Sequence, residues 1–245
     1  MSISSPKNLY ELFSYDRWKE WRHEENVRHM TYIFQPARYE LLEQIRRYAS
    51  VVRGRTLDIG AGSYSRYRHL FNYTEYVTVD VEGVAGVDVV GSAVALSFPD
   101  ASFDSIISTQ VMGDIYELRD AFAECFRVLK PGGAALITEA MFAPLHDEPY
   151  DYWRFTPYSL RRLAEDAGFT VEVIESRGGY RGVIAQMHLR YLIERYGIYH
   201  RWWSRFFNLY ARTYGGFMMW RDRHDQSTAS RLYAHGYLLI ARKPL

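Results

Sequence analysis

Thr56-Leu57-Asp58-Ile59-Gly60-Ala61-Gly62 is the stretch that decides the fold of this chain. Asp58 closes a short β-branched and aliphatic run, which is typical of a buried parallel strand. The two glycines that follow allow a sharp turn and let the backbone approach a ligand closely, because glycine has no Cβ. Glycines after a strand are common, so an ordinary strand-to-helix turn is an equally good interpretation of the turn alone.

A second carboxylate favours the binding interpretation. Asp80 ends the next apolar run, Tyr76-Val77-Thr78-Val79. It follows the turn by about 20 residues, where nucleotide-binding folds place the acid that accepts hydrogen bonds from ribose hydroxyls. The third glycine of dinucleotide-binding loops would fall at Ser65 and is absent. The pair therefore predicts a site for a nucleoside cofactor other than a dinucleotide.

The order of the segments downstream carries a family resemblance. Leu96–Asp104 leads into the apolar run Ser105–Ser108, and a helical pattern then ends in Arg127–Gly133. With this order the sequence resembles the class I S-adenosylmethionine-dependent methyltransferases, in particular the type 11 group, over roughly residues 40–176. The resemblance implies S-adenosyl-L-methionine as cofactor. It implies contact with the methionine part by Asp58, Gly60, Ala61 and Gly62, with the ribose by Asp80 and Val81, with adenine by Ser92 and Ala93, and a cofactor contact at Thr109.

Two positions depart from the family pattern. Gly91-Ser92-Ala93 stands where the family usually has Gly-Asp-Ala, so a serine replaces the acid that bonds the adenine amino group. Gly113-Asp114 stands where the family often has Glu-His after the fourth strand. These departures leave open a non-catalytic protein that only binds the cofactor.

The hydrophobic periodicity predicts an α/β fold, a doubly wound Rossmann-like seven-stranded sheet that is mostly parallel with an antiparallel edge strand. We expect helical patterns between most of the strands, a helix over residues 37–50, and a helix that begins at Pro157 with Thr156 as its N-cap. Residues 1–36 are expected to form an N-terminal helical cap and residues 37–245 the methyltransferase domain. Strands are expected at 56–59, 76–80, 87–90, 103–108, 134–139, 170–175 and 235–242.

Composition limits the remaining possibilities. A length of 245 residues suits one large domain with an elaborated cap, and 48% hydrophobic with 24% charged residues is typical of a globular chain. The single Cys125 excludes an internal disulfide. Neither a signal peptide nor an apolar run long enough for a membrane span is visible, so we expect a cytoplasmic protein.

About 60 residues separate the last two expected strands, and they form an aromatic and basic helical insertion over 177–234. Helical patterns at 183–196 and 199–214 carry many rings with arginines at their margins. A cap helix or a homodimer contact, and peripheral contact with a membrane or a lipid-linked substrate, are the two main interpretations. Nucleic-acid binding is the least favoured partner.

The loop after the fifth expected strand, residues 139–157, predicts the acceptor side of the site. His146 is the candidate general base, and Asp147 or Asp151 is the candidate residue that orients it. Tyr152 and Arg154 are candidates for binding an anionic or hydroxyl-rich small-molecule acceptor. The acids near His146 lack the spacing of an established ligand set, so no metal is predicted.

These residues predict methylation of a hydroxyl on a sugar-containing or lipid-linked small molecule. The run Asp151–Pro157 is similar to a substrate-side motif in some bacterial methyltransferases of glycan or secondary-metabolite pathways. The alternative acceptor is a soluble aromatic or quinone-like metabolite. Nucleobase methylation is disfavoured, because Ser108-Thr109-Gln110-Val111 lacks the Asn/Asp-Pro-Pro-aromatic loop of such enzymes.

Overall fold

The computed structural model describes residues 33–63 and 65–245, and these fall into two compact units. The α/β unit consists of residues 44–176 and 236–245, and the helical unit contains residues 33–43 and 177–235. The predicted helical cap over 1–36 lies almost entirely outside the described residues, and residues 33–35 are not helical. Each unit has its own architecture.

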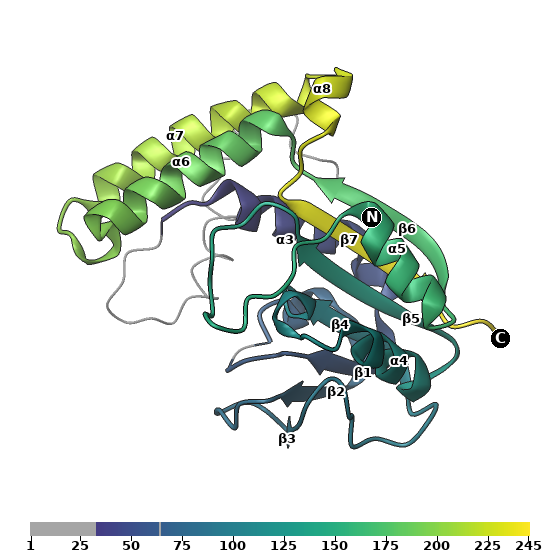
Figure 1. Ribbon diagram of the computed structural model, residues 1–245. Coiled ribbons are helices and arrows are strands. Elements are labelled where there is room, and N and C mark those ends of the chain that lie inside the picture. The colour runs from purple at the N-terminus through teal and green to yellow at the C-terminus, as the bar shows by residue number, and fades with distance from the viewer. Residues whose placement is uncertain (1–32, 64) are drawn as a thin grey trace. The chain divides into compact units, whose positions relative to one another are not determined.

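The α/β unit is built on a seven-stranded sheet of order β3-β2-β1-β4-β5-β7-β6 (Figure 1). Strands β1 to β5 pair in parallel where they are neighbours, and β7 runs antiparallel to β5. The predicted mostly parallel sheet with an antiparallel strand at one edge is confirmed, with β6 outside β7. The strands are β1 (Arg53–Ile59), β2 (Asn72–Asp80), β3 (Val89–Val90), β4 (Phe103–Thr109), β5 (Leu129–Ala140), β6 (Thr170–Arg177) and β7 (Gly236–Arg242).

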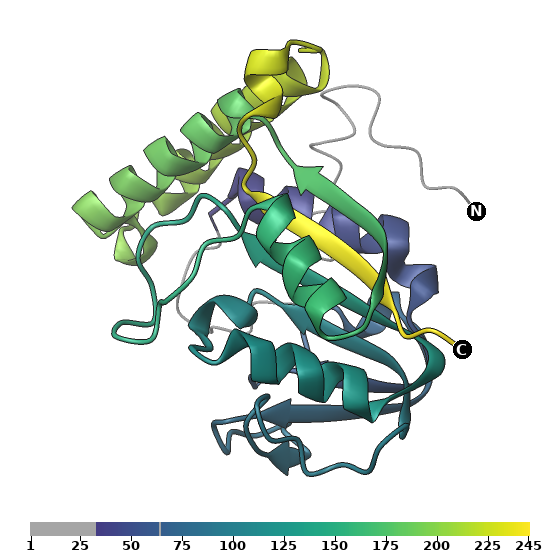
Figure 2. The same cartoon turned by 45° about the vertical axis from the view of Figure 1, so that its right-hand side comes forward.

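Two helices, α4 (Leu118–Val128) and α5 (Pro157–Asp166), lie on the same face of the sheet (Figure 2). The buried residues of α4 recur three and four apart, at Leu118, Ala121, Phe122, Cys125 and Val128, which is the pattern of a helix with one face in the core. Burial raises the pKa of the Cys125 thiol to about 12, so this cysteine is a packing residue.

Helix α5 begins as its sequence predicts. The Thr156 hydroxyl accepts a hydrogen bond from the Ser159 amide at 3.2 Å, and Pro157 occupies the first helical position. These two features satisfy or remove amide donors that would otherwise lack partners in the first turn. The helix therefore starts directly after the loop that carries the candidate base.

The prediction of helices between most of the strands is wrong for the first half of the sheet. In the described residues between β1 and β2 there is only the short 3₁₀ helix η2 (Arg68–Leu70), and β2, β3 and β4 are joined without α-helices. Side-chain hydrogen bonds hold the segment just before β3 against β2, because the Asp88 carboxylate accepts from the Thr78 amide and hydroxyl, each at 2.9 Å.

Helix α3 (Pro36–Tyr48) confirms the helix expected over 37–50, and it crosses the boundary between the two units. Its second half belongs to the α/β unit and forms hydrogen bonds with β6. Gln44 donates a hydrogen bond to the Glu175 backbone carbonyl at 3.0 Å, and Tyr48 donates one to the Glu175 carboxylate at 2.7 Å. The methyltransferase-like part of the chain is thus discontinuous in sequence and begins inside this helix.

The helical unit is a hairpin of α6 (Tyr180–Tyr196) and α7 (Ser204–Arg223), followed by the short α8 (Thr228–Arg231) (Figure 1). The Asp222 carboxylate accepts from the amides of Arg181 and Gly182, so α6 begins earlier than the predicted residue 183. It ends at Gly197, whose φ of 55° is the left-handed conformation common at helix ends. No helix in the described part of the chain is both long and apolar enough to cross a membrane.

Candidate active site

The glycine turn and Asp80 meet at one edge of the sheet. Strands β1 and β2 are parallel neighbours, so their carboxyl ends lie side by side. The amide of Gly62 donates to Asp80 Oδ2 at 2.8 Å, and the amide of Glu82 donates to Asp80 Oδ1 at 3.0 Å. Each carboxylate oxygen keeps a second lone pair, so Asp80 can hold the turn and also accept hydrogen bonds from a ligand.

The two glycines of the turn are required for different reasons. Both have positive φ, 70° at Gly60 and 57° at Gly62, which side chains rarely adopt. A Cβ at Gly60 would lie 2.3 Å from the Val111 side chain, whereas a Cβ at Gly62 would have no atom of the described residues within 4 Å. Gly60 is therefore packed against the segment after β4, and Gly62 borders space that a ligand can occupy.

The acid at the end of β1 is held by a tyrosine. Asp58 is 5% exposed and accepts a hydrogen bond from the Tyr76 hydroxyl at 2.8 Å. Burial raises the pKa of Asp58 to about 6. This bond links the first two strands directly below the turn.

The remaining cofactor candidates lie on neighbouring strand ends. Ala61 and Ala93 are buried, and Val81 is exposed. The amide of Gly91 donates to the Asp80 carbonyl at 2.9 Å, which brings the segment of Ser92 next to the ribose candidate. Thr109 ends β4 opposite Thr138 of β5. All the predicted cofactor residues therefore lie at or near one edge of the sheet, and their individual cofactor contacts stay predictions.

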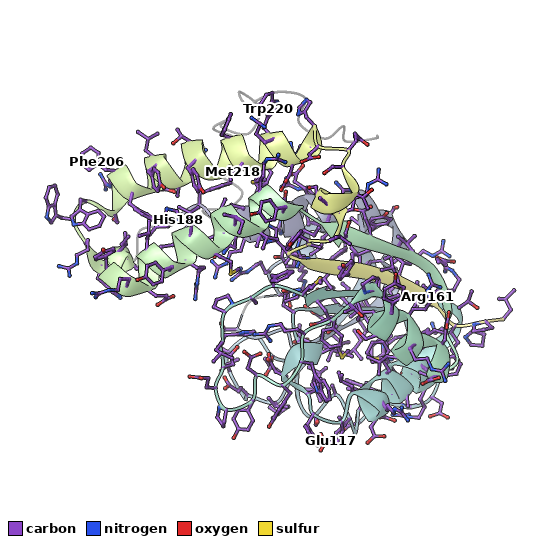
Figure 3. All side chains as sticks on the ribbon, turned by 45° about the horizontal axis from the view of Figure 1, so that its top comes forward. Glu117, Arg161, His188, Phe206, Met218 and Trp220 are labelled. Carbon is purple, nitrogen blue, oxygen red and sulfur yellow. The ribbon has the colours of Figure 1, made fainter. Side chains whose placement is uncertain are left out.

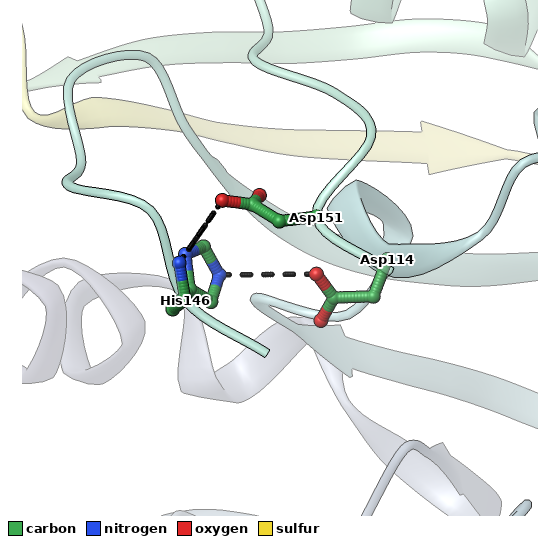
Figure 4. Close-up of side chains that lie close together, drawn as sticks. All are labelled: Asp114, His146 and Asp151. Atoms are coloured by element: carbon green, nitrogen blue, oxygen red, sulfur yellow. Dashed lines mark hydrogen bonds and ion pairs between the residues drawn. The ribbon is translucent and has the colours of Figure 1, made fainter. Parts of the chain in front are cut away.

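His146 lies between two carboxylates (Figure 4). Its Nδ1 is 3.3 Å from Asp151 Oδ2 and 3.2 Å from the Pro144 carbonyl oxygen. Both of these oxygens can only accept, so in the neutral ring Nδ1 carries the proton and the lone pair is on Nε2. Nε2 is 3.8 Å from Asp114 Oδ1, which leaves this nitrogen available as a proton acceptor.

Asp151 is the carboxylate that orients His146. Its side chain is 3% exposed and accepts hydrogen bonds from the guanidinium of Arg154 on both oxygens. The arginine holds the pKa of Asp151 down at about 2, so the carboxylate stays charged. Arg154 also donates to the Pro144 carbonyl at 3.2 Å, so it braces the His146 loop; its predicted role toward the acceptor stays a prediction.

The second orienting candidate, Asp147, has a different position. Its backbone has a φ of 47°, and its carbonyl accepts from the Tyr150 amide at 2.9 Å. The carboxylates that contact the His146 ring in the described residues are those of Asp151 and Asp114. Asp147 thus shapes the loop through its backbone.

Two acids that the sequence reasoning did not assign complete the site. Asp114 ends the 3₁₀ helix η3 (Met112–Asp114), and burial raises its pKa. Glu139 is 2% exposed near the end of β5 and accepts from the amides of Val111 at 3.3 Å and Met112 at 3.0 Å. Burial raises the pKa of Glu139 to about 8. The available signal was an acid near the end of a buried strand, Glu139, and another a few residues after the end of the preceding strand, Asp114.

Exposed rings lie next to these acids. The amides of Tyr152 and Trp153 both donate to the Gly113 carbonyl at 3.0 Å, so they are attached to η3. The Tyr116 ring centroid lies 5.4 Å from that of Tyr152 and 6.2 Å from that of Trp153. Tyr150 lies 6.5 Å from Tyr152. We call Tyr116, Tyr150, Tyr152 and Trp153 the aromatic cluster.

Asp114, His146 and Asp151 are close enough together to hold a metal ion. One possible ligand atom from each of the three residues lies within 4.8 Å of the others. Asp151, however, already accepts from Arg154 with both oxygens. A metal ion would have to displace this guanidinium. The arrangement is that of an oriented acid–base group.

Comparisons with known proteins agree with this geometry. Residues 57–137 match the family model described as a methyltransferase domain. A protein of Mycolicibacterium smegmatis named "probable S-adenosylmethionine-dependent methyltransferase" is 32% identical over 108 residues, which are 41% of this chain and 41% of that protein. The ubiquinone/menaquinone biosynthesis C-methyltransferase UbiE of Erwinia tasmaniensis is 40% identical over 85 residues, covering 33% of this chain and 34% of that protein. This chain thus matches less than half the length of either relative.

Solved structures show the same fold. The [4+2]-cyclase SpnF has a TM-score of 0.54 at 20% identity and covers 97% of this chain and 94% of its own. Phosphoethanolamine N-methyltransferase 2 of Haemonchus contortus, solved with S-adenosyl-L-methionine, has a TM-score of 0.52 at 20% identity, covering 85% of this chain and 53% of its own. The family match, with the contact between the glycine turn and Asp80 inside it, shows that residues 57–137 of the α/β unit are a methyltransferase domain of the class I S-adenosylmethionine-dependent family, whose cofactor is S-adenosyl-L-methionine.

Proposed function

We propose that this protein is an S-adenosylmethionine-dependent methyltransferase that acts on a hydroxyl of a sugar-containing or lipid-linked small molecule, with His146 as general base. The observation that carries the proposal is the position of His146 between Asp151 and Asp114. Asp114 is the last residue of η3, and Val111 just before η3 lies against Gly60 of the cofactor turn. The base and the turn are therefore joined through one short segment.

The cofactor residues fit this role. Asp80 would hold the ribose hydroxyls, because its two oxygens keep lone pairs beyond those used by the backbone. The turn at residues 60–62 would line the methionine part, where the missing side chain of Gly62 leaves space. When bound, S-adenosyl-L-methionine supplies a methyl group already activated by its sulfonium. The protein then has to align the acceptor and exclude water.

The residues around His146 handle the acceptor proton. An acceptor hydroxyl beside Nε2 would transfer its proton to that nitrogen as the new bond forms. The positive imidazolium would then lie beside Asp151 at Nδ1 and face Asp114 at Nε2. Arg154 keeps Asp151 charged and in place, so the ring cannot turn freely. General-base catalysis of this kind contributes about 10²- to 10⁴-fold.

The aromatic cluster supports a ring-shaped acceptor. Tyr116 and Tyr150 are more than 60% exposed, and Tyr152 and Trp153 about 40%. Their faces can pack on the apolar side of a sugar ring while hydroxyls reach His146 and Asp114. One comparison favours a second candidate, a quinone-like acceptor, because UbiE-named relatives are C-methyltransferases of ubiquinone and menaquinone biosynthesis. Flat rings would also stack on this cluster.

The test is turnover by His146→Ala with a panel of sugar, glycolipid and quinol acceptors. We expect the maximal rate to fall by about 10²- to 10⁴-fold while the affinity for S-adenosyl-L-methionine, measured by calorimetry, stays the same. His188→Ala is the matched control, because this histidine is in the helical unit and bonds to the Tyr210 hydroxyl. A His146→Ala variant with full activity would remove the base from the proposal.

The same panel separates the alternatives. Methyl groups on oxygen of sugar-bearing acceptors support the proposal, and transfer to a quinol ring supports the second candidate. Cofactor binding without turnover of any acceptor would favour a protein that binds S-adenosyl-L-methionine without catalysis. Mass spectrometry and NMR of the products distinguish methylation on oxygen from methylation on carbon.

A further inference from the structure

The hairpin of α6 and α7 exposes apolar side chains that its own packing does not use. One side of α7 is buried at Phe207, Ala211, Gly215 and Met219. Phe206, Leu209 and Phe217 fall on a different stripe of the same helix, since their spacings of three and eleven residues return to nearly one direction. They are 70%, 62% and 46% exposed. Figure 3 shows Phe206 on the outer side of α7.

Two more exposed rings lie at the two ends of the turn between the helices. Trp202, just before α7, is 84% exposed, and Tyr196 at the end of α6 is 53% exposed. We call Tyr196, Trp202, Phe206, Leu209 and Phe217 the hairpin surface. Exposed tryptophan and phenylalanine in such a group are unusual for a face that meets only water, and they indicate an interaction site.

The segment that carries the hairpin surface has formal charges of one sign. Residues 195–221 contain five arginines and no aspartate or glutamate. Arg201 and Arg205 are exposed and lie beside Trp202 and Phe206 in the sequence. The Arg201 guanidinium donates to the Tyr196 carbonyl at 3.3 Å, which fixes it next to the rings. An anionic lipid surface complements this combination in both charge and polarity, because rings enter the headgroup boundary and arginines pair with phosphates.

We propose that the hairpin surface binds the protein peripherally to anionic membranes. The rings of Trp202 and Phe206 enter the interface between headgroups and acyl chains, and Arg201 and Arg205 contact lipid phosphates. This proposal rests on the helical unit alone and does not depend on the proposed function of the α/β unit. It would place the protein at the surface where a lipid-linked acceptor is found.

The test is flotation of the whole protein with vesicles of phosphatidylcholine alone and of phosphatidylcholine with phosphatidylserine. We expect binding to the anionic vesicles only, weakened by salt because surface charges are screened. Trp202→Ala/Phe206→Ala and Arg201→Glu/Arg205→Glu should each reduce the partition coefficient by about tenfold or more. His146→Ala should float like the unchanged protein, which separates this test from the test of catalysis.

Matched controls come from α5 of the α/β unit. Tyr158 is 82% exposed, and Arg161 and Arg162 are exposed arginines on the same helix. Tyr158→Ala and Arg161→Glu/Arg162→Glu should keep full lipid binding. Circular dichroism checks that every variant is folded, as expected for changes at exposed positions.

Three results would overturn the proposal. The first is the absence of flotation with anionic vesicles. The second is equal loss of binding in the hairpin variants and in the α5 controls. The third is that Trp202→Ala/Phe206→Ala leaves vesicle binding unaffected but dissociates a dimer or a complex with an oligonucleotide. The hairpin surface would then bind another copy of the chain or a nucleic acid.

Discussion

At the scale of single residues, Asp80 has two tasks that the sequence could only partly suggest. Its distance from the glycine turn predicts a ribose ligand. The structure adds that the carboxylate accepts from the amides of Gly62 and Glu82, so it also shapes the turn. A substitution at this position therefore changes both the ligand contact and the loop that faces it.

Asp80→Ala should weaken the binding of S-adenosyl-L-methionine by about 1.5–3 kcal/mol, the usual scale for a lost charge-assisted hydrogen bond. Asp80→Asn should lose less affinity for the cofactor, because the side-chain oxygen of asparagine can still accept a hydrogen bond from the Gly62 amide. Calorimetry with the cofactor and its demethylated product measures both. Glu82→Gln, which removes a neighbouring charge, is the control. Unchanged affinity in folded Asp80→Ala would exclude Asp80 from the site.

At the scale of elements, the turn after β1 packs closely against the segment after β4. Gly60 and Gly62 both have positive φ, so alanine at either position costs roughly 1–2 kcal/mol in backbone strain. Only at Gly60 would the new Cβ also meet Val111, at 2.3 Å. Substitution of Gly60 therefore tests mainly the stability of the fold, and substitution of Gly62 tests mainly ligand binding.

We expect Gly60→Ala to be the more destabilising of the two, and Val111→Ala in the same chain to recover part of its loss. Gly62→Ala should lose only the strain energy but should bind S-adenosyl-L-methionine more weakly, because its Cβ enters the open space beside the turn. Urea unfolding and calorimetry of the three variants give both quantities. Equal destabilisation by the two single substitutions would contradict the packing of Gly60 on Val111.

Elements with strong local signals could be predicted from the sequence. The buried strand β4 and the capped start of α5 at Thr156 and Pro157 are in the expected places, whereas β5 begins at Leu129 and not at residue 134. The connections between β2 and β4 were not predicted, because their course depends on bonds such as that of Asp88 to Thr78. Asp114 was missed for a similar reason, since its position beside His146 depends on how η3 packs against the loop after β5.

At the scale of the whole molecule, the long separation between β6 and β7 was enough to predict a helical insertion. The boundary of the unit was not predictable in the same way. Contacts divide the described part of the chain inside α3, after residue 43. A continuous amphipathic pattern gives no sign of such a division, because both halves of the helix bury an apolar face.

The pH dependence of folding gives a last prediction for the whole α/β unit. Glu139 has a folded-state pKa of about 8, against 4.5 for the ordinary carboxyl, because it is buried. Between these pH values the folded chain keeps a proton that the unfolded chain releases, so rising pH favours unfolding by up to about 1.4 kcal/mol per pH unit. The stabilising effect is complete below the unfolded pKa and is lost as pH rises toward 8.

Glu139→Gln removes this titration and keeps an acceptor for the amides of Val111 and Met112. The free energy of unfolding of the variant should therefore rise relative to that of the unchanged protein as pH rises from 5 to 8. Asp58 and Asp151 titrate alike in both chains, so they do not contribute to this difference. Urea unfolding at each pH, followed by circular dichroism, measures the difference. Glu165→Gln on the exposed side of α5 is the control, because this carboxylate pairs with Arg161 at the surface. If the difference in free energy of unfolding between the variant and the unchanged protein stays constant across this range, Glu139 is charged in the folded chain. The amides after β4 would then be held by a buried carboxylate anion.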